Sequence, residues 1–160
     1  MQNLNTYNNF YFVGIGGIGM SALARYFHAA GKNVLGYDKT ETKLTTELQN
    51  EGISISFEDV VDEKFSELNK ENTLVIYTPA IKVLGILDYF NQNGFEVLKR
   101  AKVLGLITEN TECISVAGTH GKTTTSSLVA HLCKVANLPF SGFLGGISEN
   151  YKSNFIYNGT

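Results

Sequence analysis

The chain has 160 residues, of which 43% are hydrophobic and 18% are charged, and its formal net charge is -2. This length suits one full domain, or one domain and part of a second. The small negative charge provides no basic field, so a nucleic-acid partner is not expected. No apolar run approaches the ~20 residues that cross a bilayer. Residues 1–9 are polar and contain no Lys or Arg, which excludes a signal peptide. We therefore expect a cytoplasmic protein without a membrane partner.

The two cysteines do not indicate a special site. Cys113 and Cys133 form no CxxC motif and have no adjacent His pair in zinc spacing. In a cytoplasmic protein such cysteines are reduced, and we expect both to be mostly buried.

Strand and helix patterns alternate over the first two thirds of the chain. The run 10–15 is apolar and ends in glycines, as a buried parallel strand does. Apolar residues spaced three and four apart then mark one face of a helix over 20–27. Pro79 ends the apolar strand at 73–78, because proline cannot donate to a sheet ladder. Residues 58–72 are acidic and polar, as expected of a solvated loop and short helix. Further strands are expected at 33–37, 53–57 and 95–98, and further helices at 42–50, 83–93 and 100–107.

A second unit is expected after a polar linker at 108–112. It begins with a strand over 113–117 and a glycine-rich turn, and ends with a strand over 155–157. Between them lies a helix, whose predicted apolar face is Leu128, Val129, Leu132, Val135 and Ala136.

The alternation predicts an α/β fold. Residues 1–108 form a Rossmann-like parallel sheet with helices on both faces, and residues 112–160 form the truncated start of a P-loop ATP-binding domain. A strand, a helix and a fragment cannot bury a sheet on both faces. The second unit is therefore either an extra layer on the first or an incomplete domain, and we favour the incomplete domain.

The first glycine loop, Gly14-Ile15-Gly16-Gly17-Ile18-Gly19, fits G-x-G-x-x-G between a strand and a helix. Glycines there permit a tight turn, close approach of a phosphate and close packing of helix on strand. The helix N-terminus offers N–H groups and a positive dipole end to a pyrophosphate. Asp38 ends the next strand, where this fingerprint places an acid that holds a ribose hydroxyl. The pattern predicts a nucleotide diphosphate site without identifying the nucleotide. The alternative is that the glycines serve only the turn.

The second glycine loop, Gly118-Thr119-His120-Gly121-Lys122-Thr123, also joins a strand pattern to a helix pattern. It ends like a Walker A loop, although Val116 stands where the strict motif has its first glycine. Backbone N–H groups can cradle phosphates, Lys122 can neutralise phosphate oxygens, and the Thr123 hydroxyl can bind Mg²⁺. The alternative is a glycine-rich turn with a surface lysine.

Two loops of different kinds narrow the classes of function. A dehydrogenase needs only the first loop and also a substrate domain, for which the chain has no room. An NAD-binding Rossmann regulatory module would explain the first loop and Asp38, but not the lysine-bearing loop. An ATP-dependent enzyme that acts on a nucleotide-activated sugar needs both loops.

The motifs resemble one family along essentially the whole chain. The segments GIGGIGM with the following SALA (14–24), YTPAI (77–81), KRA (99–101), AGTHGKTTT (117–125) and LGG (144–146) are similar to the muramyl ligase family, and in particular to its UDP-N-acetylmuramate–L-alanine ligases of peptidoglycan synthesis. The resemblance implies a first domain that binds the UDP part of UDP-N-acetylmuramate rather than NAD. It also implies ATP, Mg²⁺ and L-alanine as the other ligands.

The resemblance also implies roles for single residues. Lys122 and Thr123 would be catalytic, with Thr123 also binding Mg²⁺. Arg100 would face the bound anion, or serve a surface or structural role. Pro79 departs from the family, which more often has Ser-Ser-Ala here, and it lacks a hydroxyl and an N–H. The UDP-sugar contacts would be Gly14, Gly16, Gly17, Ile18, Gly19, Asp38, Thr78, Pro79 and Ala80, and the ATP contacts Gly118, Thr119, His120, Gly121, Lys122, Thr123 and Thr124.

The implied reaction activates a carboxylate. Transfer of the ATP γ-phosphoryl group to the lactyl carboxylate gives an acyl phosphate, which the amine of L-alanine attacks as phosphate leaves. In the family, an acidic Mg²⁺-binding segment follows the strand after the LGG region, and the chain ends at about that point. We therefore expect this chain to be an inactive fragment of the ligase.

Overall fold

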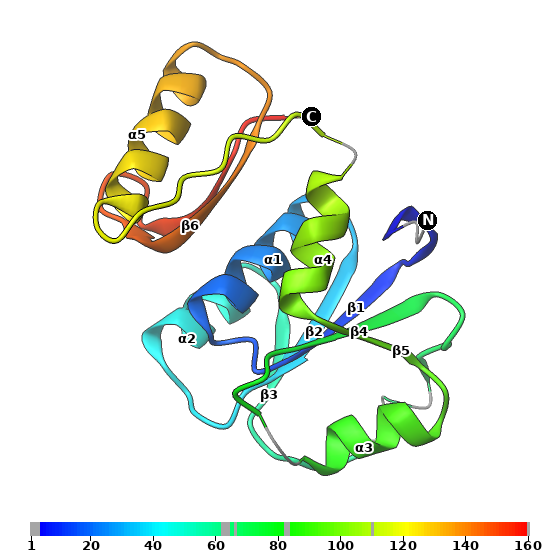
Figure 1. Cartoon of the computed structure of the whole chain (residues 1–160). Coiled ribbons are helices and arrows are strands. Elements are labelled where there is room, and N and C mark those ends of the chain that lie inside the picture. The colour runs from blue at the N-terminus through cyan, green and yellow to red at the C-terminus, as the bar shows by residue number, and fades with distance from the viewer. Residues whose placement is uncertain (1–3, 62–64, 66, 82–83, 110, 160) are drawn as a thin grey trace.

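The protein is described here by a computed structural model, which covers residues 4–61, 65, 67–81, 84–109 and 111–159. Figure 1 shows a sheet covered by helices and, beside it, a smaller unit made of one helix and a hairpin. The linker after α4 joins the two (Figure 1).

The larger unit is built on a five-stranded sheet with the order β3-β2-β1-β4-β5. Every neighbouring pair in this sheet is parallel. The predicted strands are confirmed to within a few residues, and the short strand near residue 55 lies at an edge, as its alternating pattern indicates. The strands are β1 Asn9–Val13, β2 Asn33–Tyr37, β3 Ser54–Ser56, β4 Thr73–Tyr77 and β5 Glu96–Lys99.

Helices cover both faces of the sheet (Figure 1). Helices α1, α2 and α4 lie on one face and α3 lies on the other. The predicted helices are thus confirmed, although residue 83, where one was expected to begin, lies outside the described residues, as do residues 62–64 and 66 of the expected loop. The helices are η1 Leu4–Thr6, α1 Ile18–Ala29, α2 Lys43–Asn50, α3 Gly85–Gln92 and α4 Arg100–Thr108.

Alternate residues of β1 build the two halves of the core. Phe10 and Phe12 are fully buried under α1, and the Phe10 ring stacks on Phe27 with centroids 3.8 Å apart. Tyr11 points to the other face and packs against Phe90 of α3. A strand buried on both faces accounts for the continuous apolar run that the sequence shows there. The Rossmann-like α/β fold is confirmed.

The smaller unit rests on α1. It contains α5 Lys122–Val135 and an antiparallel hairpin of β6 Ser141–Ser148 and β7 Ser153–Tyr157. The ring of Tyr26 on α1 lies 5.4 Å from that of Phe143 and 6.1 Å from that of Phe155. The hairpin is therefore an extra layer against the helix, and the division into domains at 108–112 remains a prediction.

The expected helix is confirmed as α5, but the strand expected at 113–117 and the expected burial of the two cysteines are wrong. Residues 113–117 form no strand and Cys113 is exposed, because no described strand lies beside this segment to complete a ladder. Cys133 is only partly buried. On the predicted apolar face of α5, Leu128, Leu132 and Val135 are 59%, 67% and 71% exposed. That face has the periodicity of a buried helix, but the hairpin packs against a different side, where Ala130 is buried.

Within the described stretches, none of the helices combines the length and apolar character needed to cross a bilayer.

Leucine truncation on the two longest helices separates the packed face from the unpacked one. Leu23→Ala in α1 removes a side chain that is 1% exposed and should lower the unfolding free energy by about 2–5 kcal/mol. Leu132→Ala in α5 removes a side chain that is 67% exposed and should change it by less than about 0.5 kcal/mol. Urea denaturation of the two variants measures both values. Equal losses would show that the apolar face of α5 is covered in solution.

Candidate functional site

The carboxyl ends of three parallel strands meet at one edge of the sheet. Val13 at the end of β1 is in register with Tyr37 of β2 and with Tyr77 of β4. The next residues, Gly14, Asp38 and Thr78, therefore leave the sheet side by side. All three are expected from their sequence motifs to contact one ligand, and the topology places them together.

Asp38 supports the backbone of the first loop. Its Oδ2 accepts a hydrogen bond of 2.7 Å from the Gly16 N–H, and its Oδ1 accepts one of 3.1 Å from the Thr40 N–H. The Tyr37 carbonyl accepts from the N–H groups of Gly14 and Ile15 at 2.7 and 3.0 Å. The end of β2 thus fixes the loop from two sides.

The loop glycines are required by close packing. Gly14 has a φ of +86°, and a Cβ there would lie 2.7 Å from Ile81 Cδ1 and 3.0 Å from Thr78 Cγ2. A Cβ on Gly16 would lie 2.8 Å from Asp38 Oδ2 and 2.9 Å from Thr45 Cγ2. Of the YTPAI segment, Thr78 and Ile81 therefore touch the loop, whereas Pro79 and Ala80 are exposed. Thr45, buried in the capping box of α2, is a loop contact that no sequence motif indicated.

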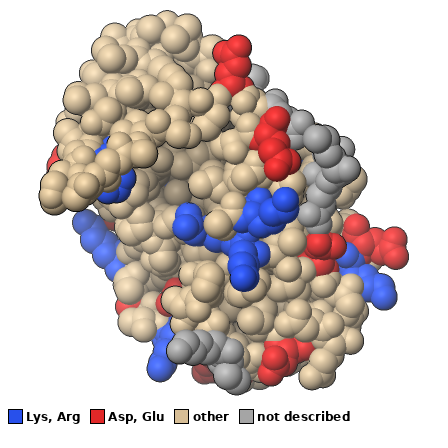
Figure 2. Space-filling view, in the orientation of Figure 1, with Lys and Arg blue, Asp and Glu red and all other residues tan. Residues whose placement is uncertain are grey.

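Arg100 lies against the first turn of α1. A Cβ on Gly19 would be 2.8 Å from its guanidinium nitrogen. In the described part of the chain no carboxylate forms a salt bridge with Arg100. Lys99 and Lys102 flank it, and Figure 2 shows Lys and Arg side chains gathered over this part of the surface. An unneutralised guanidinium beside a helix N-terminus favours an anion.

The acidic side chains at this edge are already engaged by backbone groups. Asp59 accepts from the N–H groups of Gly85 and Ile86, at 2.9 Å each, and so caps α3. Burial raises the pKa of the Tyr37 hydroxyl above its ordinary value, and the charges of Asp59 and Asp38 raise it further. Tyr37 therefore stays neutral at physiological pH, and its hydroxyl lies beside the two carboxylates of Asp38 and Asp59.

The second glycine loop begins α5. Gly121 is the N-cap residue and has a φ of +77°, which only glycine adopts readily. The Lys122 Nζ donates to the carbonyls of Gly118 and Thr119 at 2.6 and 3.1 Å. The lysine thus lies over its own loop, where a phosphate group would accept hydrogen bonds from its ammonium group. Thr119, His120 and Thr124 are exposed around it.

Thr123 connects this loop to the hairpin. A Cβ on Gly145 would lie 3.4 Å from the Thr123 Oγ1, and one on Gly146 would lie 3.4 Å from its Cγ2. The LGG segment of β6 therefore packs directly on the threonine that sequence analysis assigned to Mg²⁺. No group of three or more His, Cys, Asp or Glu in the described ranges could hold a metal ion.

A cavity of about 140 Å³ lies between the two units. Gly19 and Arg100 line it from the larger unit and Gly145 lines it from β6. The first loop and Gly145, which packs on Thr123, thus border the same cavity. Its remaining lining residues are Ala22, Leu23, Leu104, Phe143 and Leu144.

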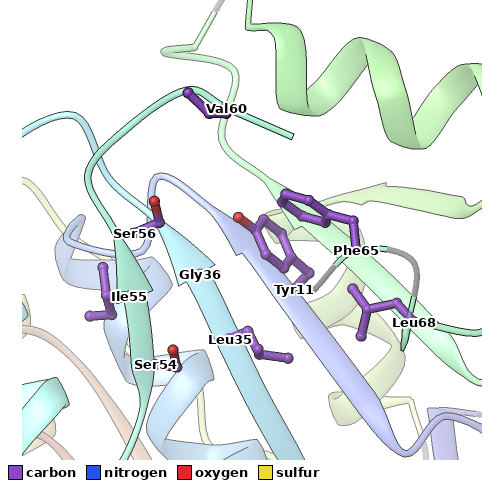
Figure 3. A pocket seen from close by; sticks show the side chains of 9 residues that line it. All are labelled: Tyr11, Leu35, Gly36, Ser54, Ile55, Ser56, Val60, Phe65 and Leu68. Carbon is purple, nitrogen blue, oxygen red and sulfur yellow. The ribbon is translucent and has the colours of Figure 1, made fainter. Parts of the chain in front are cut away.

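A second cavity, of about 230 Å³, lies on the opposite face of the sheet. Figure 3 shows the Tyr11 ring between Phe65 and the ends of β2 and β3, with Ser54 and Ser56 on the far side. None of the residues expected to bind a ligand lines it.

Comparison with known proteins gives concordant results. The profile of the Mur ligase family, catalytic domain, matches residues 9–111. The chain is 55% identical over 159 residues to the UDP-N-acetylmuramate–L-alanine ligase of Flavobacterium psychrophilum and 52% identical over 163 residues to that of Parabacteroides distasonis. These alignments cover 99% of this chain but only 36% and 35% of the relatives. The chain thus spans about a third of the length of these relatives.

Solved structures agree in fold. The UDP-N-acetylmuramate–alanine ligase of Thermotoga maritima superposes with a TM-score of 0.80 at 34% identity, covering 94% of this chain and 35% of that one. The UDP-N-acetylmuramate:L-alanyl-γ-D-glutamyl-meso-diaminopimelate ligase of Neisseria meningitidis gives a TM-score of 0.76 at 26% identity, covering 93% and 46%. Since the family profile covers most of the chain, the chain belongs to the Mur ligase family.

Proposed function

We propose that this chain is the UDP-N-acetylmuramate-binding portion of an ATP-dependent ligase that joins L-alanine to UDP-N-acetylmuramate. The observation that carries the proposal is the cavity between the first loop and the segment of β6 that packs on Thr123. Gly19 of the first loop and Gly145, the neighbour of Thr123, face it from opposite units. A γ-phosphoryl donor and a sugar carboxylate need this kind of juxtaposition to react.

The UDP diphosphate is assigned to the first loop. Ile18 and Gly19 offer backbone N–H groups at the N-terminus of α1, and Arg100 adds a cation beside them. Gly16 and Gly17, whose N–H groups donate to Asp38 and to the Gly14 carbonyl, are assigned to close backbone contact with the diphosphate. Asp38 and Thr78 border this loop, so the uridine is placed over the ends of β2 and β4. Gly14 shapes the turn, and the exposed Pro79 and Ala80 form the rim.

ATP is assigned to the second loop. The residues fit a triphosphate, because Lys122 already places its ammonium group over the loop and Thr123 presents a hydroxyl beside it. Gly118, Thr119, His120, Gly121 and Thr124 complete the assigned contacts. A bound Mg²⁺ would supply charge neutralisation of the phosphate oxygens, and Thr123 is the residue of this chain that would help hold it.

The proposed chemistry has two steps. An oxygen of the sugar carboxylate attacks the γ-phosphorus, the bond to ADP breaks, and an acyl phosphate forms. The L-alanine amine then attacks the acyl carbon, loses a proton, and phosphate leaves as the amide forms. Lys122 contributes to the first step by offsetting negative charge on the transferred group. Binding of L-alanine is assigned to parts of the protein beyond these two loops.

Calorimetric titration tests the ligand. UDP-N-acetylmuramate should bind this chain saturably and NADH should not. Asp38→Ala should weaken binding roughly tenfold, because the first loop loses the carboxylate that holds Gly16 in place. Asp38→Asn, which keeps an oxygen for that N–H, should bind more tightly than the alanine variant.

Binding of NADH without the UDP-sugar would contradict the proposal and favour a dinucleotide-binding module. Failure of both ligands to bind would contradict the claim that these residues are sufficient to form the UDP-sugar site.

Two neighbouring glycines provide a matched test of the loop. Gly16→Ala places a methyl group 2.8 Å from Asp38 Oδ2 and should weaken UDP-sugar binding roughly tenfold, since overpacking costs about 1–3 kcal/mol. Gly17→Ala meets its nearest atom at 3.6 Å with an ordinary φ of -67°, and should weaken binding less than about threefold. The same titration measures both. Similar losses in the two variants would mean that the packing of Gly16 against Asp38 does not set the loop conformation that binds the ligand.

A further inference from the structure

A single amide side chain joins the hairpin to the first loop. Asn154 in β7 is fully buried, and its Nδ2 donates to the Ile18 carbonyl at 2.6 Å and to the Ser21 Oγ at 2.7 Å. Ile18 and Ser21 form the first turn of α1, directly after the loop glycines. Ser21 also donates to the carbonyls of Gly17 and Ile18, at 3.0 and 3.1 Å. The hairpin thus touches the turn that carries the proposed diphosphate contacts.

The other end of the amide is held by a buried cation. The Asn154 Oδ1 accepts a hydrogen bond from Arg25, which is 6% exposed. Glu51, at the end of α2, fixes the guanidinium through two carboxylate oxygens at 2.7–3.0 Å, and Glu47 lies 3.6 Å away. Both the donor and the acceptor of Asn154 are therefore directed, so its side chain has one orientation at this junction.

The same hairpin reaches the second loop. Gly145 and Gly146 of β6 pack on Thr123, and β6 is hydrogen-bonded to β7 as an antiparallel pair. One two-stranded element therefore contacts the first turn of α1 through Asn154 and the Lys122-Thr123 loop through its glycines. The neighbouring aromatic contacts of Phe143 and Phe155 with Tyr26 are apolar and non-directional, and they tolerate sliding that the amide does not.

We infer that Asn154 is a positioning residue that holds the two phosphate-binding loops in a fixed relation. The inference rests on the proposed function, because it gives both loops a ligand. When the diphosphate orders the first turn of α1, the amide transmits that order to β7, and β6 transmits it to Thr123. Without the amide, each loop keeps its own contacts, but their relative placement is no longer specified.

Hydrogen exchange on the 160-residue chain, with and without UDP-N-acetylmuramate, tests the inference. In the wild type the ligand should slow exchange at 14–22 and also at 121–126, the latter by about fivefold, the lower end of typical couplings between sites. In Asn154→Ala the first response should remain and the second should disappear. Asn158→Ala is the matched control, because its amide nitrogen donates to Asn137 and Leu138, both in the smaller unit, and it should retain both responses.

If the Asn154 hydrogen bonds only stabilised the fold, their loss would lower the unfolding midpoint. It would not alter the ligand-induced difference in hydrogen exchange, which is measured within each variant. Ser21→Ala removes one of the two acceptors of the Asn154 amide and should reduce the response at 121–126. If Asn154→Ala does not fold, the response of Ser21→Ala tests the positioning role of Asn154 instead. Retention of the full second response in Asn154→Ala, or in Ser21→Ala in that case, overturns the inference. A wild type that responds only at 14–22 overturns it too, but leaves the proposed function standing. A wild type that responds nowhere overturns both.

Discussion

The parallel register of β1, β2 and β4 is the constraint on which the first site depends. Because Val13 is aligned with Tyr37 and Tyr77, the chain leaves all three strands at the same level. The loop after β1 then has no free space, since Asp38 and Thr78 press on it from both sides. Glycine is what such a turn requires, so the G-x-G-x-x-G pattern follows from the packing as well as from a ligand. A role of the glycines in the turn is consequently compatible with a role in binding a diphosphate.

Features set by local periodicity could be predicted from the sequence. The strand at 33–37 and the helix at 42–50 are confirmed, because burial on one or both faces leaves a short-range signature in the chain. The strand expected at 113–117 is wrong for the complementary reason. A strand exists only where another strand pairs with it, and none of the described strands lies beside this segment. The exposed apolar face of α5 likewise carries a true helical pattern, although none of the described residues covers it.

The polar junction between the units could not be predicted in the same way. Asn154 and Ser21 are separated by 133 positions, and a lone polar residue in a strand usually faces water. Asn154 is buried because the hairpin packs against α1. The sequence likewise predicts an exposed helix residue at Arg25, whereas its guanidinium lies between Glu51 and Asn154 in the structure. Long-range polar pairs have no period, so motif and propensity arguments do not detect them.

The choice of polar groups at this junction has a physical consequence. Replacing a buried ion pair with well-packed apolar residues is often neutral or stabilising, so the Arg25–Glu51 pair is weak evidence for stability alone. Directed hydrogen bonds differ from apolar contacts in that a shift of about 1 Å breaks them, whereas aromatic rings can slide by that amount. A junction that must fix one loop relative to another therefore gains more from an amide than from another phenylalanine. The placement of Asn154 between Arg25 and the first turn of α1 has the geometry that such a requirement selects.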